Sequence, residues 1–260
     1  MCNAAWLVLD AISSESYRKK KHMVNYIKLM VPKSLRKLTY PLRERVFDLH
    51  STKSYSQEGE DLVLRRVFEG RKSGFYVDVG AHHPHRFSNT NLFYKAGWHG
   101  INIEPNPDSI ADFKRLRQRD INLQCGVSDI EQHLTYYKFN EPALNTFDPD
   151  IVDDRLNKTT YKVVQKIIVP VLRLDHILDD HLAVGQKIDF LTVDVEGLDL
   201  QVLESNNWST YRPAMVLAES LCSNLADASE NEIARFMSAQ GYSIFAKTYN
   251  TWMFKDQLSE

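Results

Sequence analysis

The sequence predicts an α/β protein with a mostly parallel β-sheet, because three short apolar runs alternate with helical patterns. Residues 75–79 include Asp78, residues 100–104 end at Glu104, and residues 188–194 end at Asp194. The carboxyl ends of neighbouring parallel strands open into one crevice, where such acids can accept hydrogen bonds from the hydroxyls of a ribose. The predicted fold class is therefore Rossmann-like, with a ligand that carries a ribose.

The loop after the first strand is the first part of the predicted site. Gly80 allows a close backbone approach to a ligand, and a helical stretch runs from Ser88 to the residue before Gly97. The positions after Gly80 read Ala-His-His-Pro, so the GxGxxG loop that binds the pyrophosphate of a dinucleotide is absent. S-adenosylmethionine (SAM) has a ribose and an adenine but no phosphate, so it fits this loop. An NAD-dependent Rossmann oxidoreductase and a non-catalytic scaffold with this fold stay as alternatives.

The other elements are predicted in chain order. Ser56 can cap a helix whose first turn is acidic, and Asn106 with Pro107 begins the helix after the second strand. Further strands are expected at residues 121–124 and 214–218, helices at 174–181, 199–205 and 230–240, and a closing hairpin at 242–246 and 251–254. Residues 130–171 break the alternation, with extended stretches at 134–139 and 165–171 around the polar residues 140–160. An insertion of this length beside a crevice is usually functional or disordered.

Composition sets limits on the class of protein. The chain has 260 residues, 43% hydrophobic and 25% charged, enough for one large α/β domain with an extension. A formal charge of −2 gives no basic field for nucleic acid. The three cysteines, Cys2, Cys125 and Cys222, lie far apart and favour a reducing compartment. No stretch approaches the roughly 20 apolar residues that span a bilayer, so a cytoplasmic location is expected.

The amino-terminal 50 residues differ from the rest. Between Arg18 and Arg45 the only acid is Glu44, and apolar residues recur at helical spacing. A basic amphipathic helix of this kind can pack on the domain, or lie on an anionic membrane or a partner protein. The expected division is a basic helical extension at residues 1–50 and a domain at residues 51–260.

Six motifs together resemble the FkbM family of SAM-dependent methyltransferases. They are Ser-Tyr-Ser-Gln-Glu-Gly-Glu-Asp (54–61), Val-Asp-Val-Gly-Ala (77–81), Ser-Asn-Thr (88–90), Asn-Ile-Glu-Pro-Asn (102–106), Val-Ser-Asp (127–129) and Asp-Phe-Leu-Thr-Val-Asp-Val-Glu-Gly (189–197). The resemblance implies a class I methyltransferase fold, with a seven-stranded sheet, an antiparallel last strand and helices on both faces. It also implies O-methylation by SAM, with S-adenosylhomocysteine (SAH) as product. The acceptor would be a hydroxyl, often of a sugar in a glycan, surface polysaccharide or natural product. Pro84 stands where many class I enzymes have a glycine, so the loop should differ locally.

The strand ends and the resemblance together predict the SAM site. Glu104 is expected to hold both ribose hydroxyls, and Asp129 is a candidate for the adenine amine. In the family the helix near residue 60 closes over the methionine end of SAM. The predicted SAM-binding residues are Gln57, Glu60, Asp78, Gly80, Ala81, Ser88, Asn89, Thr90, Glu104, Pro105, Asn106, Gly126, Val127, Ser128 and Asp194. The insertion at 130–171 is assigned to acceptor recognition.

Methyl transfer to a hydroxyl needs a group that removes its proton. Asp194 and Glu196 are the first candidates and Glu219 the third, because each follows a strand end near the expected methyl group. The same three acids could instead hold a magnesium or manganese ion that lowers the pKa of the hydroxyl. A zinc site at His82, His83 and His85 is disfavoured, since adjacent residues in extended backbone point to opposite sides.

Overall fold

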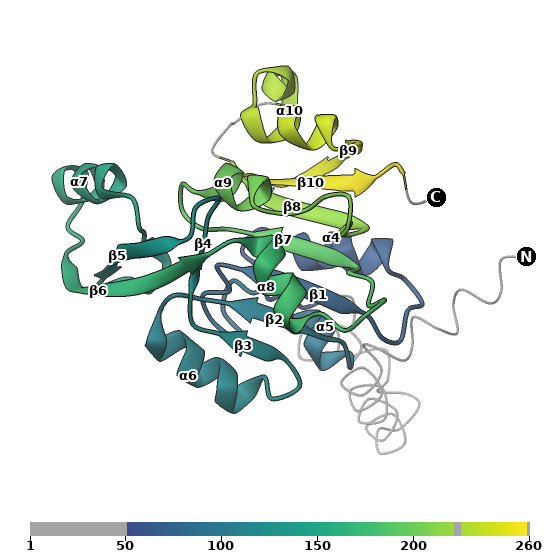
Figure 1. Ribbon diagram of the computed structural model, residues 1–260, viewed down its shortest axis with the longest axis horizontal. Coiled ribbons are helices and arrows are strands. Elements are labelled where there is room, and N and C mark those ends of the chain that lie inside the picture. Colours follow the sequence, from purple (N-terminus) through teal and green to yellow (C-terminus); the bar gives the residue numbers. More distant parts are fainter. Residues whose placement is uncertain (1–50, 221–224, 259–260) are drawn as a thin grey trace, which may run out of the picture. The chain divides into compact units, whose positions relative to one another are not determined.

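A computed structural model describes residues 51–220 and 225–258 (Figure 1). The described chain divides into two compact units: one holds residues 51–54 and 64–72, the other residues 55–63 and 73–258. Helix α4 (Glu60–Val67) begins in the larger unit and ends in the smaller one. The predicted basic extension lies outside the described residues, and the boundary at residue 50 stays a prediction. Within the described ranges, no helix has the length and apolar character needed to cross a bilayer.

The larger unit is built on a seven-stranded sheet with the order β3-β2-β1-β7-β8-β10-β9. The strands are β1 (Phe75–Val79), β2 (His99–Ile103), β3 (Ile121–Leu123), β7 (Phe190–Val193), β8 (Met215–Glu219), β9 (Tyr242–Lys247) and β10 (Thr251–Asp256). The first five pair in parallel, and β10 is antiparallel to both of its neighbours. The predicted mostly parallel sheet with an antiparallel last strand is therefore confirmed.

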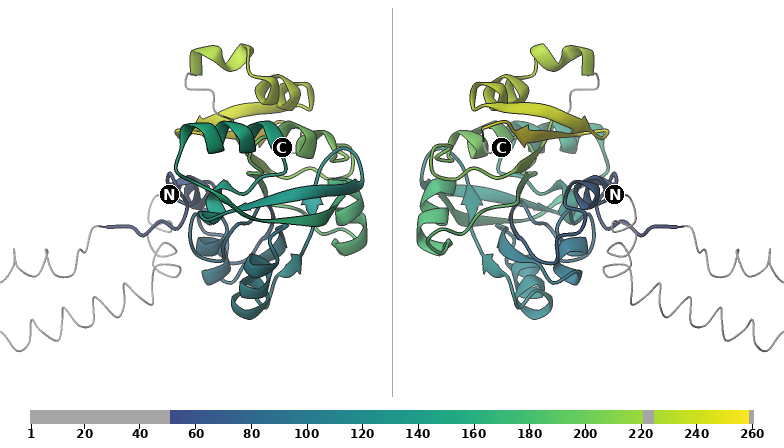
Figure 2. Two further views of the ribbon diagram at one scale, coloured as in Figure 1. Left: turned by 90° about the vertical axis from the view of Figure 1, so that its left-hand side faces the viewer. Right: turned by 90° about the vertical axis from the view of Figure 1, so that its right-hand side faces the viewer.

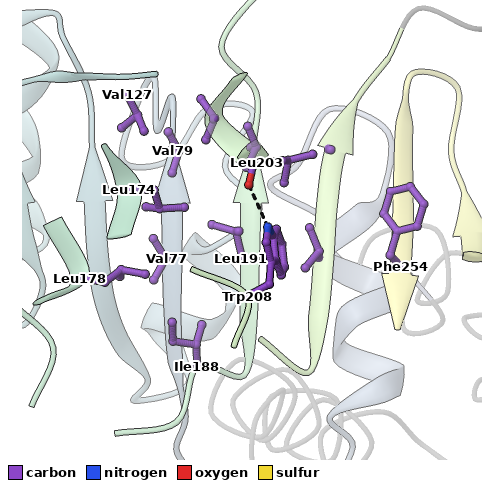
Figure 3. Close-up of a cluster of buried hydrophobic side chains, with 14 of the residues drawn as sticks. Val77, Val79, Val127, Leu174, Leu178, Ile188, Leu191, Leu203, Trp208 and Phe254 are labelled. Atoms are coloured by element: carbon purple, nitrogen blue, oxygen red, sulfur yellow. Dashed lines mark hydrogen bonds between the residues drawn. The ribbon is translucent and has the colours of Figure 1, made fainter. Parts of the chain in front are cut away.

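One face of this sheet carries the main hydrophobic core (Figure 3). Helices α8 (Leu174–His181) and α9 (Asp199–Glu204) lie in this core with side chains of β1 and β7 such as Val77 and Leu191. Helix α10 (Glu232–Ala239) extends the core where it packs against β9 and α9. Trp208 is buried in this core, and its Nε1 donates to the carbonyl of Leu203 at 2.9 Å (Figure 3). The ring therefore fills apolar space while its polar nitrogen keeps a hydrogen bond.

Aromatic residues and a buried ion pair fill the other face. Phe93 of helix α5 (Asn91–Lys95) packs against Phe190, with ring centroids 4.9 Å apart. Arg117, just after helix α6 (Pro107–Leu116), is fully buried and donates to Asp120 at 2.9 Å and to the hydroxyl of Tyr76 at 2.7 Å. A guanidinium so far from water needs each of these partners. Helices thus cover both faces, as predicted.

The insertion joins β4 (Gly126–Val127), which precedes it, in a second, three-stranded sheet of order β4-β6-β5. Its own strands are β5 (Gln132–Phe139) and β6 (Val163–Leu172). Figure 1 shows the β5–β6 ribbon extending from the main sheet, with helix α7 (Pro149–Lys158) near its far end, and Figure 2 shows the ribbon from two further sides. Two short 3₁₀ helices, η2 (Pro142–Leu144) and η3 (Leu225–Ser229), complete the larger unit. The extended stretches were expected, but α7 was not. Asp148 caps it by accepting the N–H of Asp150 at 2.8 Å, and Pro149 takes its first position.

Candidate active site

A pocket opens at the carboxyl ends of β1, β2 and β7, and residues of the insertion form its other wall. The empty space that it encloses, open solvent included, is about 900 Å³. The sheet side contributes Asp78, Val79, Gly80, Ala81, Ile103, Glu104, Pro105, Thr192, Asp194, Val195 and Glu196, and the insertion side contributes Tyr136, Pro142, Ala143, Asn145 and Phe147. The pocket therefore joins segments that are far apart in the sequence.

Gly80 fixes how the ends of β1 and β7 meet. Its φ is 79°, and a Cβ at this position would lie 1.8 Å from the carbonyl oxygen of Asp194. Any side chain would thus collide with backbone as well as occupy an unfavourable conformation. The sequence predicts a close approach of Gly80 to a ligand, and in the structure Gly80 closely approaches the Asp194 backbone. As a result, the chain that leaves β1 and the chain that leaves β7 meet at the pocket, which both Asp78 and Asp194 line.

Glu104 lies 4% exposed at the end of β2, with both carboxylate oxygens engaged. Oε2 accepts the N–H of His82 at 2.8 Å, and Oε1 accepts the N–H of Asn106 at 2.8 Å and the hydroxyl of Tyr136 at 3.4 Å. A carboxylate offers about four lone-pair directions, so at least one remains for a ligand. Burial raises the pKa of Glu104 to about 7, and the two backbone N–H groups oppose that rise. Ligand hydroxyls that donate to Glu104 would stabilise its ionised form.

Asp78 is held by side chains that lie behind the pocket. Thr90 Oγ1 donates to its carboxylate at 2.8 Å, and Arg117 donates to the same Thr90 oxygen at 3.1 Å. Burial raises the pKa of Asp78 to about 6, while the Thr90 hydrogen bond lowers it. Asp78 is therefore oriented by a buried network that includes the Arg117–Asp120 pair.

Asp194, Glu196 and Glu219 come together, with ligand atoms within 4.8 Å of one another. Asp194 has exposed surface because it faces the pocket, but protein atoms surround its carboxyl group closely. Burial and the neighbouring charge of Glu219 therefore raise its pKa well above the usual range. Burial also raises the pKa of Glu219 to about 7. Each of these two acids therefore holds a proton more readily than an isolated carboxyl group does.

Glu196 sits in a constrained loop. Its φ is 56°, which costs a non-glycine residue roughly 1–3 kcal/mol. Its carboxylate pairs with Arg155 of α7, its carbonyl accepts from Thr146 Oγ1 at 3.1 Å, and Asp199 accepts from the N–H groups of Val195 and Gly197 at 3.4 Å each. Burial raises the pKa of Glu196, and the Arg155 guanidinium opposes the rise. The predicted base is thus an ion-paired carboxylate.

Most of the predicted SAM-binding residues line this pocket. They are Gln57, Asp78, Gly80, Ala81, Asn89, Glu104, Pro105, Gly126, Val127 and Asp194. Glu60, Ser88, Thr90, Asn106 and Ser128 are outside the lining, as is Glu219. Ser88 and Asn106 support their neighbours, since Ser88 Oγ accepts the N–H of Asn91 at 3.1 Å and Asn106 Oδ1 accepts that of Asp108 at 3.2 Å.

Two residues predicted to contact the ligand, Glu60 and Asp129, instead form hydrogen bonds with other side chains of the protein. Glu60 accepts from the hydroxyls of Thr248 at 3.1 Å and Thr251 at 3.2 Å, so it ties α4 to the last strand. Asp129 accepts the hydroxyl of Ser128 at 2.9 Å. Both residues therefore support the fold around the pocket without lining it.

The histidines after β1 serve mainly to shape the loop. His83 Nδ1 accepts the backbone N–H groups of His85 and Arg86, each at 3.0 Å, and His85 Nδ1 lies 3.2 Å from Asn91 Oδ1. His82 lines the pocket with φ 53°, and burial lowers its pKa to about 4, so it is neutral at pH 7. Across residues 51–220 and 225–258, the side chains placed to share a metal ion are the three acids, and the histidines are not among them.

Sequence reasoning missed the aromatic wall of the pocket. Tyr136 and Phe147 pack together with ring centroids 4.8 Å apart, and a Cβ on Gly126 would lie 2.8 Å from Phe147. Their positions depend on the pairing of β5 with β6 and of β4 with β6. No local pattern brings residues 136 and 147 to Glu104 and Gly126. Arg155 was missed for the same reason.

Comparison with known proteins places this site in a family. The model of the methyltransferase FkbM domain matches residues 78–244, more than half of the chain. No curated protein sequence matches. Solved structures with similarity include the C-terminal domain of precorrin-6Y C5,15-methyltransferase from Rhodobacter capsulatus, at 12% identity over 80% of this chain and 90% of that one, TM-score 0.37. The same enzyme from Geobacter metallireducens matches at 10% identity over 78% and 90%, TM-score 0.39. A methyltransferase from Geobacter sulfurreducens matches at 13% identity over 90% and 97%, TM-score 0.39.

The strand order and the family match carry the assignment, and the match confirms the resemblance seen in the sequence motifs. Family and fold together indicate SAM as the methyl donor. The chain belongs to the FkbM family of methyltransferases.

Proposed function

We propose that this methyltransferase transfers a methyl group from SAM to a hydroxyl of a sugar, in a glycan, a surface polysaccharide or a natural product. One observation carries the proposal: three carboxylates, those of Asp194, Glu196 and Glu219, meet beside a pocket that also holds a buried ribose acceptor, Glu104. The three carboxylates can take a proton from a hydroxyl, and Glu104 can hold the ribose of the donor.

The charge of the pocket supports SAM over a dinucleotide. Four acids line it, Asp78, Glu104, Asp194 and Glu196, and no lysine or arginine is among the lining residues of the described chain. A pyrophosphate would meet these acids with no cation to balance it. SAM supplies a methyl group on a positively charged sulfonium. Such a donor suits acidic surroundings, and Glu104 can accept from its ribose hydroxyls.

Removal of the acceptor proton is assigned to the acid cluster. A sugar hydroxyl is a weak nucleophile at neutral pH, so a carboxylate within hydrogen-bond reach accelerates transfer. The raised pKa values of Asp194, Glu196 and Glu219 bring these groups closer to the operating pH of a general base. The insertion wall at Pro142, Asn145 and Phe147 supports a role of residues 130–171 in choosing the acceptor.

Calorimetric titration with SAM, SAH and NADH tests the donor. We expect SAM and SAH to bind and NADH not to bind. A non-catalytic scaffold would bind SAM weakly or not at all, and binding of NADH alone would overturn the assignment. Transfer of labelled methyl from SAM to a panel of oligosaccharides, with the position of the label read by mass spectrometry, then tests O-methylation. Label on carbon or nitrogen would refute it.

A further inference from the structure

The polar part of the insertion forms one wall of the pocket. We call residues 140–158, which include η2 and α7, the inserted segment. It supplies Pro142, Ala143, Asn145 and Phe147 to the pocket lining. Figure 1 shows α7 apart from the main sheet, so this wall depends on contacts other than packing on that sheet.

Arg155 is the centre of those contacts. Its Nη2 pairs with the carboxylate of Glu196, and its Nη1 donates to the carbonyl of Leu144 at 2.6 Å. The two side chains of the ion pair are 17% and 29% exposed, so water competes with the pair only in part. One guanidinium thus joins α7 to the end of η2 within the inserted segment and to the loop after β7 outside it.

The loop after β7 receives two more contacts from the same segment. Thr146 Oγ1 donates to the carbonyl of Glu196 at 3.1 Å. Gly197 has φ 111°, and a Cβ there would lie 2.7 Å from the side chain of Ile151. Glu196 and Gly197 are therefore the place where the inserted segment meets the catalytic edge of the sheet.

A second ion pair lies at the start of the segment. Arg86, in the loop after β1, donates to Glu141 at 2.8 Å, with side chains 46% and 32% exposed. An ion pair this exposed contributes little. The pair of Arg155 and Glu196 is less exposed, so of the two ion pairs it contributes more to holding the inserted segment against the rest of the protein.

We propose that Arg155 is a positioning residue: through its pair with Glu196, it holds the inserted segment over the donor pocket and fixes Glu196 in its left-handed conformation. This inference rests on the proposed function. The inserted segment retains the donor product as well as shaping the acceptor side. Ligand release then requires the pair to loosen, and Glu196 is presented to the acceptor only while the segment is in place.

The test measures the dissociation rate of labelled SAH from the full chain after dilution into excess unlabelled SAH. Arg155→Ala should release SAH roughly tenfold faster, because a charge-assisted hydrogen bond is lost. Arg155→Lys, which keeps the charge, should lie between Arg155→Ala and the wild type. The matched control is Lys158→Ala, which breaks the exposed Lys158–Asp154 pair on the same helix and should leave the rate unchanged.

Hydrogen exchange supplies the second measurement. Faster exchange in Arg155→Ala should be confined to residues 140–158 and 195–198. If the wild type does not bind SAH, the proposed function fails. If it binds SAH and Arg155→Ala releases it at the wild-type rate, the positioning role is refuted. Equal acceleration in Arg155→Ala and Lys158→Ala, with exchange raised throughout the chain, would also refute it.

Discussion

Replacing Glu104 with glutamine should separate donor binding from stability. The substitution removes a charged acceptor from the ribose, and the loss of one such hydrogen bond costs about 1.5–3 kcal/mol, or roughly ten- to a hundredfold in affinity. In the free protein Glu104 also accepts the N–H groups of His82 and Asn106. Glutamine keeps one acceptor oxygen, so one buried N–H loses its partner, at about 1–3 kcal/mol.

The raised pKa of Glu104 favours the glutamine variant at high pH and so offsets the cost of the lost hydrogen bond. The pKa of Glu104 rises from 4.5 to about 7 on folding, so its contribution to the stability of the folded protein is complete below pH 4.5. That contribution is lost as the pH rises through 7. The loss reaches about 3 kcal/mol at pH 8. Glu104→Gln escapes this loss, so the stability of the free protein at pH 8 should change little while SAH affinity falls. Few substitutions outside a ligand site would show this pair of effects.

SAH titration calorimetry and urea unfolding at pH 6 and pH 8 test these expectations. Wild-type affinity should rise between the two pH values, because ribose hydroxyls bind the ionised carboxylate, and the affinity of Glu104→Gln should be nearly flat. Glu131→Gln is the control, since that exposed carboxylate pairs with His176 away from the pocket. A folded Glu104→Gln variant that binds SAH as tightly as the wild type at pH 8 would refute the ribose assignment.

The remaining predictions concern catalysis, backbone geometry and domain organisation. Glu196→Gln keeps an oxygen for Arg155, so SAH affinity should stay within a few fold while turnover with the natural acceptor falls by roughly 10²–10⁴. Asp194→Asn should reduce both quantities. Activity that a chelator abolishes and magnesium or manganese restores would assign these acids to a metal instead of a base. Gly80→Ala would place a Cβ 1.8 Å from a carbonyl oxygen at φ 79°, so it should lower the urea midpoint sharply, and an unchanged midpoint would contradict this geometry. A chain beginning at Ser51 should fold and bind SAM, whereas an insoluble product would place residues 1–50 in the core. Salt-sensitive binding of the full chain to anionic vesicles, absent in the shorter chain, would support membrane contact.

The strand ends could be predicted because each is a local pattern. Asp78, Glu104 and Asp194 each lie at the end of a short apolar run, and parallel pairing brings such ends together whatever the loops do. Helix α7 was also within reach, since Asp148 followed by Pro149 is a common helix start. The polar composition of residues 140–160 concealed it.

The rest of the site depends on contacts between distant residues. Tyr136 reaches Glu104 only because β5 pairs with β6, and Arg155 reaches Glu196 across 41 positions of sequence. Glu60 shows the converse: an acid expected at the ligand is used by two threonines at the other end of the chain, Thr248 and Thr251. Neither outcome leaves a trace in spacing or periodicity. A single sequence therefore predicts the sheet side of the pocket better than its opposite wall.

The close approach of Gly80 to the Asp194 carbonyl means that the two sides of the pocket differ in how much sequence change they tolerate. On the sheet side, backbone meets backbone, so the donor half tolerates neither a larger residue at Gly80 nor a shift of β7. The other wall belongs to the β5–β6 ribbon, which extends from the main sheet (Figure 1), and side chains form the surface that this wall presents to the pocket. Exchange of residues 140–158 between members of the family, with Arg155 retained, should therefore transfer acceptor preference and leave SAH affinity nearly constant, which calorimetry on such chimaeras can check. In this architecture, a new substrate requires a new ribbon tip and no change in the sheet.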